Sequence, residues 1–369
     1  MKKRIAIYIG ALGSGGIESC TVTQFKHLDN DKFYVDFIVD KEPQRNHYYK
    51  EIVSRGGRVV ALIDENKKGS FKFSKLISLF KVVRRSKYNA FHLHISYPTS
   101  LMYLVVVKLA FGKCITLATS HAQGTSNKSF KTRVANGISR MLLPPLCKYR
   151  FCDSDLAGKW MFGSYSFKTI INGIEVASYS FNSENRNEIR KELSIGEYDF
   201  VIGHVGRFEI DKNHKFIIEV FEEYHMKCPE SKLLLIGNGS LHEAIETMVN
   251  EKHISDSVIY VRNTPFVYKY LSAMDLFVFP SFREGFGLVA IEAQAASLPV
   301  LASTTIPRET QQTNRIYYED LNKGALYWSE IIMNIRGKMS DRSSVDLRKL
   351  YDNCDINNLT IELSKLYDQ

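Results

Sequence analysis

Two glutamates, Glu284 and Glu292, stand on either side of a glycine turn in the stretch PSFREGFGLVAIEAQAASLP at 280–299. The apolar run LFVF just before it is typical of a buried strand, and Leu288 to Ala296 is expected to form a helix. The turn GFG would then present backbone N–H groups at the helix N-terminus, where anions bind. Glu292 falls on the second turn among apolar neighbours, so its carboxylate needs a partner.

Two cations follow another short strand, VIGHV. Arg207 and Lys212 lie in the turn GRFEIDKN, ahead of a helix expected to begin near Asn213. The planar guanidinium and the compact ammonium are both suited to oxygen atoms of a diphosphate. The alternative is that both side chains are solvated cations of a surface loop.

Glycine turns follow two further strands. GALGSGGIES at 10–19 places Gly15 and Gly16 ahead of an expected helix, and GNG at 237–239 follows the strand LLLI. Glycine lets the backbone approach a ligand, and a helix N-terminus favours an anion. A simple change of chain direction also needs glycine, and the spacing differs from the dinucleotide pattern GxGxxG.

Histidine and aspartate side chains follow strands in the first half. His121 ends the strand CITLATSH, where it is either catalytic or structural. His92 and His94 alternate along FHLHIS and face the same side, but no third ligand accompanies them, so we predict no metal site. The sequence DSD at 153–155 could hold a divalent ion, although a helix N-cap at one of its last two residues is the simpler interpretation.

Strands must position these residues. Apolar runs alternate with helical patterns along the chain, which indicates parallel sheets covered by helices and ligand sites at the carboxyl ends of the strands. The pattern restarts near Asp199, after a polar, turn-rich stretch at 171–187 that we interpret as a linker. We predict an α/β protein with two doubly wound, Rossmann-like domains, 1–171 and 172–350, facing a central cleft. The last helix, within 351–369, could pack on the first domain. The runs predicted as strands are RIAIYIG, FYVDFIV, RVVALI, AFHLHIS, CITLATSH, KYRFCDS, VIGHVGRF, KLLLIGNG, SVIYV, LFVFPS and LPVLAS.

Charge is distributed unevenly. The net charge is +9, yet residues 1–171 hold 28 Lys and Arg against 11 Asp and Glu, and the rest of the chain is acidic. Residues 66–152 contain 16 basic side chains and no acidic one. Such a region attracts an anionic partner: a phospholipid surface, a phosphorylated substrate or nucleic acid. The aromatic residues are not arranged as an RNA-stacking platform, so we favour the membrane surface.

The cellular compartment is indicated by the cysteine pattern and by two apolar segments. The six cysteines form neither a CxxC pair nor a zinc pattern, which suits a reducing environment. The start MKKRIAIYIG imitates a signal peptide, but its β-rich run turns at once into glycines, so we predict a strand. The apolar segment LMYLVVVKLAF is too short to span a bilayer. We therefore expect a cytoplasmic protein.

Taken together, the motifs resemble retaining glycosyltransferases of the GT-B fold, family 4, over nearly the whole chain. The segments CDSDLAGKWMFG at 152–163 and STTIPRET at 303–310 are similar to the bacterial capsular and exopolysaccharide group. The motifs that carry the resemblance are GGIE (15–18), His121, NGI (172–174), GRF…KNH (206–214), GNG (237–239), Glu284 with Glu292, and PVLAS (299–303).

This resemblance implies transfer of a hexose or N-acetylhexosamine from a nucleotide diphosphate-sugar, in its UDP form, without a metal or a separate cofactor. The acceptor would be a glycan, lipid-linked and presented at the inner face of the membrane, where the basic first domain would dock. Glu292 would bind the ribose, while Glu284 and His121 would contact the transferred sugar. The diphosphate and nucleotide would meet the side chains or backbone of Arg207, Lys212, Gly15, Gly16, Gly237, Asn238, Phe286, Gly287 and Leu288.

Three other functions fit parts of the pattern. A nucleotide-sugar 2-epimerase shares the two-domain architecture and would need no acceptor. A glycosidase would use the two carboxylates but would leave Arg207, Lys212 and the glycine turns unexplained. A basic nucleic-acid-binding protein would account for the first half, but the acidic second half and the paired glutamates argue against it.

Overall fold

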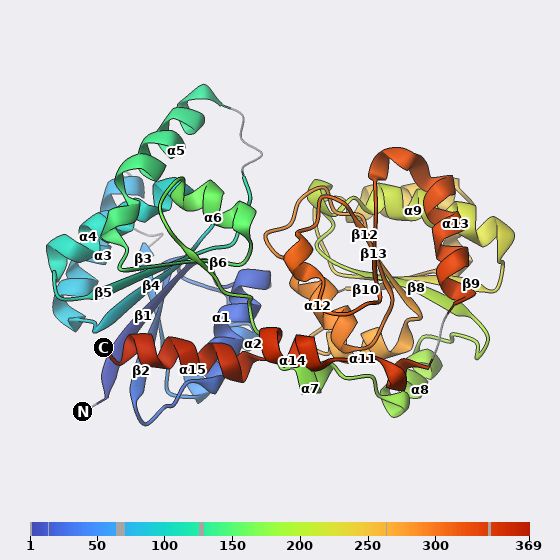
Figure 1. Ribbon diagram of the computed structural model, residues 1–369, viewed down its shortest axis with the longest axis horizontal. Coiled ribbons are helices and arrows are strands. Elements are labelled where there is room, and N and C mark those ends of the chain that lie inside the picture. The colour runs from blue at the N-terminus through green and yellow to red at the C-terminus, as the bar shows by residue number, and fades with distance from the viewer. Residues whose placement is uncertain (1, 14, 64–70, 125–128, 263, 339–340) are drawn as a thin grey trace. The chain divides into compact units, whose positions relative to one another are not determined.

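The computed structural model describes residues 2–13, 15–63, 71–124, 129–262, 264–338 and 341–369 (Figure 1). The chain divides into two compact units. The first domain comprises Met1–Ile174 together with Cys354–Gln369, and the second comprises Glu175–Asn353.

The first domain is built on a seven-stranded sheet in the order β3-β2-β1-β4-β5-β6-β7, in which neighbouring strands pair in parallel. Its strands are β1 (Lys3–Gly10), β2 (Phe33–Lys41), β3 (Arg58–Ile63), β4 (Ala90–Ile95), β5 (Ile115–Ser120), β6 (Tyr149–Cys152) and β7 (Lys168–Thr169). Its helices are α1 (Gly16–His27), α2 (His47–Ser54), α3 (Phe71–Ser86), α4 (Met102–Ala110), α5 (Phe130–Leu142), α6 (Asp155–Phe162) and α15 (Ile356–Tyr367), with short 3₁₀ turns η1 (Pro98–Leu101) and η2 (Pro144–Leu146).

Helices cover both faces of this sheet. Side chains of α1, α2 and α15 form one apolar core, and those of α3, α4 and α6 form the other. Because both faces are buried, the central strands are continuous apolar runs rather than alternating ones. The apolar start of the chain is β1, a buried central strand, which confirms the prediction of a strand.

The second domain repeats this plan on a six-stranded parallel sheet in the order β10-β9-β8-β11-β12-β13. Its strands are β8 (Phe200–Val205), β9 (Ser231–Ile236), β10 (Val258–Val261), β11 (Leu276–Phe279), β12 (Val300–Ser303) and β13 (Ile316–Glu319). Its helices are α7 (Val176–Tyr179), α8 (Ser183–Glu192), α9 (His214–Lys227), α10 (His242–Glu251), α11 (Val267–Ala273), α12 (Leu288–Ala295), α13 (Gly324–Arg336) and α14 (Arg348–Cys354). The 3₁₀ turns are η3 (Ile210–Lys212), η4 (Ser255–Ser257), η5 (Arg308–Thr310), η6 (Leu321–Lys323) and η7 (Arg342–Ser344).

The two doubly wound sheets confirm the predicted fold class. Every predicted strand is present, whereas β7 and β13 were not predicted because they are short or lack a distinct apolar run. The stretch interpreted as a linker is not purely irregular, since α7 lies within it and α8 begins there. α8, SENRNEIRKE, escaped prediction because it has almost no apolar periodicity.

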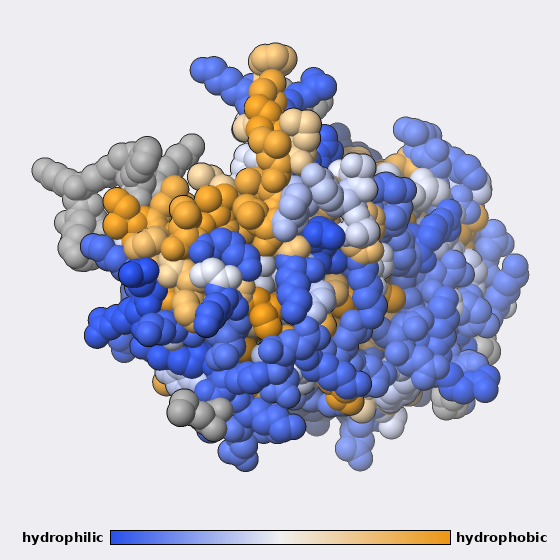
Figure 2. All heavy atoms as spheres, turned by 60° about the vertical axis from the view of Figure 1, so that its left-hand side comes forward, coloured by the Kyte–Doolittle hydropathy of each residue, from blue (hydrophilic) through white to orange (hydrophobic). Residues whose placement is uncertain are grey.

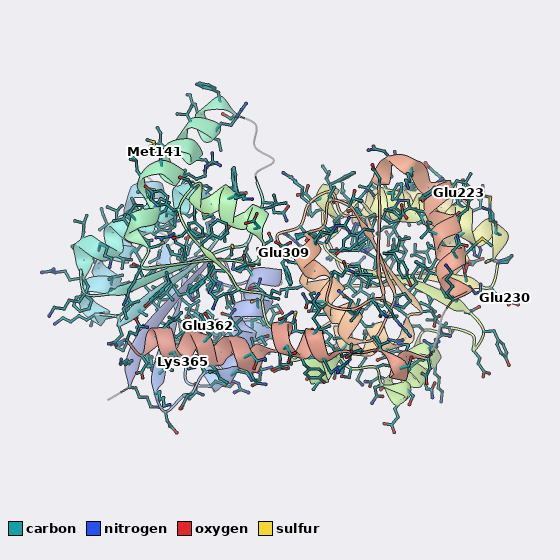
Figure 3. All side chains as sticks on the ribbon, in the orientation of Figure 1. Met141, Glu223, Glu230, Glu309, Glu362 and Lys365 are labelled. Atoms are coloured by element: carbon teal, nitrogen blue, oxygen red, sulfur yellow. The ribbon has the colours of Figure 1, made fainter. Side chains whose placement is uncertain are left out.

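The C-terminal helix α15 packs on the first domain. Its residues Ile356, Leu363 and Tyr367 are buried in the core that α1 also lines, and Ile174 forms an isolated parallel bridge with Asp355 ahead of the helix. Glu362, labelled in Figure 3, pairs with Lys168 of β7 at 2.5 Å. Within the described residues, no helix is long and apolar enough to cross a membrane.

Candidate active site

The cations and carboxylates predicted in the second domain follow β8 and β11, neighbouring strands of its sheet. Lys212 ends η3, and its Nζ donates to Glu284 Oε1 at 2.5 Å, with both side chains mostly buried. The loops are also joined through their backbones, because the N–H of Phe282 donates to the Asp211 carbonyl. The structure thus brings together two predicted site residues that are 72 positions apart.

Arg207 precedes Lys212 in the same turn after β8. It is exposed, and within the described part of the chain its guanidinium makes no hydrogen bond or ion pair. The stem of Lys212 lies against Gly206, where an added Cβ would be 3.4 Å from Lys212 Cγ. Arg207 is therefore available to a ligand without losing an internal contact.

Glycines let the loops after β8 and β9 touch. A Cβ at Gly237 would lie 2.0 Å from the Gly206 carbonyl oxygen, and one at Gly239 would lie 2.5 Å from that of Phe208. Asn238 holds this turn through its side-chain oxygen, which accepts from the Gly239 N–H at 2.9 Å. Close packing thus accounts for these glycines, while ligand contacts of Gly237 and Asn238 stay a prediction.

The N-terminus of α12 is formed as predicted. Gly287 is its N-cap with φ of +86°, and a Cβ there would meet the ring of Phe279 at 2.9 Å. Phe286 is buried, and its carbonyl accepts from the hydroxyl of Thr310 at 2.6 Å. The first N–H groups of α12, including that of Leu288, lack intrahelical partners by geometry and are directed at whatever lies ahead of the helix.

The end of β12 and the loop after it hold the segment between β11 and Glu284 in place. The hydroxyls of Ser303 and Thr305 both donate to the Ser281 carbonyl at 2.7 Å. This anchoring fixes the backbone between β11 and Glu284. Sequence spacing did not reveal it, because the contact joins side-chain hydroxyls to a carbonyl more than 20 residues away.

Glu292 is partly buried on α12, as expected. Burial raises the pKa of its carboxyl from the ordinary value of 4.5 to about 7, although a hydrogen bond from Tyr179 opposes this shift. The Tyr179 hydroxyl donates to Glu292 Oε1 at 3.1 Å. Tyr179 ends α7, inside the stretch interpreted as a linker, and no sequence pattern pairs it with a residue 113 positions away.

The glycine turn of the first domain already has an acid near it. α1 begins at Gly16 with Gly15 as N-cap, and a Cβ at Gly15 would lie 2.6 Å from Glu18 Oε2. The carboxylate of Glu18 therefore folds over the turn at the helix N-terminus, where negative charge is favourable. A ligand phosphate at Gly15 and Gly16 would have to share this position with Glu18.

His121 lies in a buried polar cluster of the first domain. Its Nδ1 is 3.2 Å from Asp153 Oδ2, and its Nε2 is 3.0 Å from His94 Nδ1. Because a carboxylate only accepts, we assign the His121 proton to Nδ1, so that Nε2 accepts from His94. Burial, followed by the neighbouring His92 and His121, lowers the pKa of His94 well below its ordinary range, which keeps that ring neutral.

The remaining polar residues here are structural. His92 bonds to Tyr367 at 2.6 Å and to Thr119 at 2.7 Å. Ser154 is the N-cap of α6 and accepts from the Ala157 N–H, which confirms the capping interpretation of DSD. Among the described residues, no group of three His, Cys, Asp or Glu side chains could hold a metal ion. All six cysteines are free thiols.

Comparison with known proteins adds an independent line of evidence. Residues 185–312 match the family model "Glycosyl transferases group 1". The chain is 25% identical to the putative glycosyltransferase EpsF of Bacillus subtilis over 83% of this chain and 80% of that protein. It is 23% identical to the Escherichia coli UDP-Gal:alpha-D-GlcNAc-diphosphoundecaprenol alpha-1,3-galactosyltransferase, over 78% of this chain and 76% of the enzyme.

Solved structures give the same fold. The structure of Anabaena HepE in complex with UDP and glucose superposes with a TM-score of 0.80 at 15% identity, covering 99% of both chains. WaaG, a glycosyltransferase involved in lipopolysaccharide biosynthesis, superposes with a TM-score of 0.70 at 12% identity, covering 98% of this chain and 99% of that one. Residues 185–312 are thus similar to the glycosyl transferases group 1, and the chain has the two-domain fold of solved GT-B glycosyltransferases.

Proposed function

We propose that this protein is a retaining, metal-independent glycosyltransferase that moves a hexose or N-acetylhexosamine from a UDP-sugar to a lipid-linked glycan in capsule or exopolysaccharide assembly. The observation that carries the proposal is the meeting of Lys212 and Glu284 after β8 and β11, with exposed Arg207 in the same turn as Lys212. The α12 N-terminus follows Glu284 by only a few residues. A cation for a diphosphate therefore contacts a carboxylate for a sugar, and further N–H donors follow that carboxylate closely in the chain.

The chemistry requires charge to be stabilised at both ends of the breaking bond. As the bond between the anomeric carbon and the phosphate oxygen breaks, negative charge grows on the β-phosphate and positive charge on the sugar ring. Arg207, Lys212 and the amides of Gly287 and Leu288 would stabilise the first, and one preorganised donor of this kind contributes about 3 kcal/mol in the transition state. Glu284 would stabilise the ring and accept from its hydroxyls.

The pair of Lys212 and Glu284 suggests how the site accommodates its donor. An ammonium has three N–H donors, so Lys212 can bind a phosphate oxygen while keeping one bond to Glu284. The second oxygen of Glu284 then remains for sugar hydroxyls. Each side chain thus holds the other in position before the substrate arrives.

Retention of configuration needs attack from the face that the phosphate leaves. The acceptor hydroxyl forms the new carbon–oxygen bond on that face, and its proton passes to the departing phosphate oxygen. Substrate itself then serves as the base, consistent with the absence of an evident dedicated base in the sequence. Glu292, next to Tyr179, would accept from the ribose hydroxyls.

The first domain would hold the acceptor, with His121 at the transferred sugar. Both ring nitrogens of His121 are engaged by Asp153 and His94, so a sugar hydroxyl would have to displace His94 from Nε2.

We also propose that the protein works in the cytoplasm as a peripheral protein of the inner membrane face. The relative from Escherichia coli, whose name specifies a diphosphoundecaprenol acceptor, supports a lipid-linked acceptor.

Nucleotide binding is the first test. The thermal midpoint should rise with one of the UDP-, GDP-, ADP- and CMP-sugars, because a ligand at 100 times its Kd stabilises by about 2.7 kcal/mol. We expect the UDP forms to act, as UDP-glucose is bound in a HepE structure. No shift with any nucleotide would overturn the proposal.

Product analysis is the second test. With a UDP-sugar and a sugar on a lipid diphosphate, NMR of the product should show the donor's anomeric configuration, also in the presence of a chelator. Conversion of the donor without an acceptor would favour the 2-epimerase instead. An inverted product would overturn the retaining mechanism but leave glycosyl transfer standing.

A further inference from the structure

Helix α5 has its apolar side chains on the outside. Phe130, Val134, Ile138, Met141 and Leu142 are exposed by 79, 42, 51, 62 and 58%. At about 100° per residue they occupy an arc of about 120°. The less exposed residues of the opposite arc are polar, namely Thr132, Asn136 and Ser139. A surface helix of a globular protein normally has the reverse arrangement.

The buried side of α5 gains little from this arrangement. Asn136 is the one buried residue of the helix, and neither polar atom of its side chain has a partner within the described residues. The helix is therefore not held in place by burial of its own apolar face. An exposed apolar stripe of this length marks an interaction site.

Helix α4 extends the exposed apolar surface. Its inward row of Leu104, Val107 and Ala110 is buried, while Met102, Val105 and Leu109 face outward. We call the exposed apolar side chains of α5, together with this outward row of α4, the apolar ridge. Figure 2 shows a protruding ridge of apolar side chains at the top that continues into a broader apolar area on the first domain. Met141, labelled in Figure 3, lies near the C-terminal end of α5.

Cations border the ridge. Lys131 and Arg133 of α5 are exposed, and Arg140 stacks over Trp160. Residues 66–152, which include α4 and α5, contain no acidic side chain. A protein partner of mixed charge would leave this excess uncompensated, whereas an anionic bilayer matches both the cations and the apolar side chains. A convex ridge also suits a soft lipid surface.

Length decides how the ridge would meet the bilayer. α5 has 13 residues and is about 20 Å long, which is too short for the hydrocarbon core. A helix with an apolar arc bordered by cations lies in the plane of the interface.

We propose that the apolar ridge docks this protein on an anionic phospholipid surface, with α5 lying flat at the level of the lipid headgroups and acyl chain ends. The partner so named belongs to the function proposed above, since the acceptor lipid would reside in the same surface. Docking itself depends only on the first domain.

Vesicle sedimentation tests the proposal. The full chain should co-sediment with vesicles of equal parts phosphatidylglycerol and phosphatidylcholine, bind far less to pure phosphatidylcholine, and be released as salt rises from about 0.1 to 0.5 M. The variant Val134→Ser/Ile138→Ser/Met141→Ser should partition at least about tenfold less. Lys131→Glu/Arg133→Glu should weaken binding chiefly at low salt.

The matched control is Met226→Ser/Leu326→Ser/Ile361→Ser. It removes three side chains of similar exposure, 66, 51 and 57%, from helices outside the ridge, and it should bind like the wild type. Equal loss in both triple variants, undiminished binding of the ridge variant, or no binding of the wild type would overturn the proposal. So would a wild-type dimer in sedimentation equilibrium that the ridge variant converts to a monomer.

Nucleotide-induced thermal shifts in the same preparations separate this proposal from the catalytic one. They also show whether each variant is folded. Vesicle binding without any nucleotide shift would leave docking standing and remove the glycosyltransferase. A UDP-sugar shift without vesicle binding would do the opposite.

Discussion

The two domains place their candidate polar residues in opposite ways. In the first, His94, His121 and Asp153 are packed together, and the bonds of His121 end on its neighbours. In the second, Arg207 is exposed, and Lys212 and Glu284 join the loops that follow β8 and β11. The first arrangement fixes ring orientation, whereas the second offers charges that a ligand can share. We therefore expect substitutions in the second domain to change substrate chemistry most directly.

The largest effect is expected at the cations. Arg207→Ala and Lys212→Ala should each lower kcat by about 100-fold or more, because charge on the departing phosphate would lose a preorganised partner. Steady-state kinetics with saturating UDP-sugar measures this. Lys215→Ala, an exposed lysine of α9 three positions on, is the matched control and should be near normal. Near-normal turnover of both site variants would break the comparison between the domains.

Substitution of Glu292 should weaken donor binding and remove its pH dependence. Glu292→Gln should raise the donor KM by about tenfold or more, since the neutral amide accepts poorly from ribose hydroxyls. Wild-type donor affinity should fall as the pH drops through about 7, the raised pKa of this carboxyl. The glutamine variant should show no such pH dependence.

The same carboxyl predicts a stability difference of known sign. Its folded pKa exceeds its ordinary value, so the wild type loses stability as the pH rises from about 4.5 to 7. Glu292→Gln should therefore be more stable at pH 8, on the order of 1–2 kcal/mol, and equal near pH 4.5. Urea unfolding at both pH values measures this. Equal stability at pH 8 would mean that Glu292 is well solvated.

Asp153→Asn tests whether the first-domain cluster orients His121. The asparagine amide would donate to His121 Nδ1 and move the ring proton to Nε2, which His94 already faces with its own N–H. We expect kcat to fall roughly tenfold with donor KM unchanged. Asp155→Asn, an exposed neighbour paired with Lys159, is the control. An unchanged kcat would limit His121 and Asp153 to a structural role.

The smallest effect is expected at Tyr179. Tyr179→Phe removes one hydrogen bond to Glu292, so the donor KM should rise only by about threefold. Because that bond lowers the pKa of Glu292, the pH at which donor affinity is half lost should move upward. Tyr198→Phe, a highly exposed tyrosine, should change neither value. A raised KM with an unmoved pH profile would mean that Tyr179 acts through packing alone.

Local sequence predicted more of the scaffold than of the contacts. Apolar runs bounded by glycines identify the strands, and parallel sheets put their carboxyl ends along one edge, so Lys212, Glu284 and Glu292 could be recognised. Tyr179 and Asp153 could not be paired with Glu292 and His121, because hydrogen bonds between distant segments leave no spacing in the sequence.

Surface properties show the same division. The basic character of residues 66–152 could be read from composition. The inverted orientation of α5 could not, because helical periodicity shows that an apolar face exists without showing which way it points. Only the tertiary packing of Asn136 against the domain reveals it.

The return of α15 to the first domain makes the second domain an insertion. The chain leaves the first domain after Ile174 and returns to it at Cys354, so two separate segments of the chain make up that domain. A protease that cut a single crossing would leave the two halves covalently joined through the other. Two cuts would release the second domain as a free fragment with its own pair of ends.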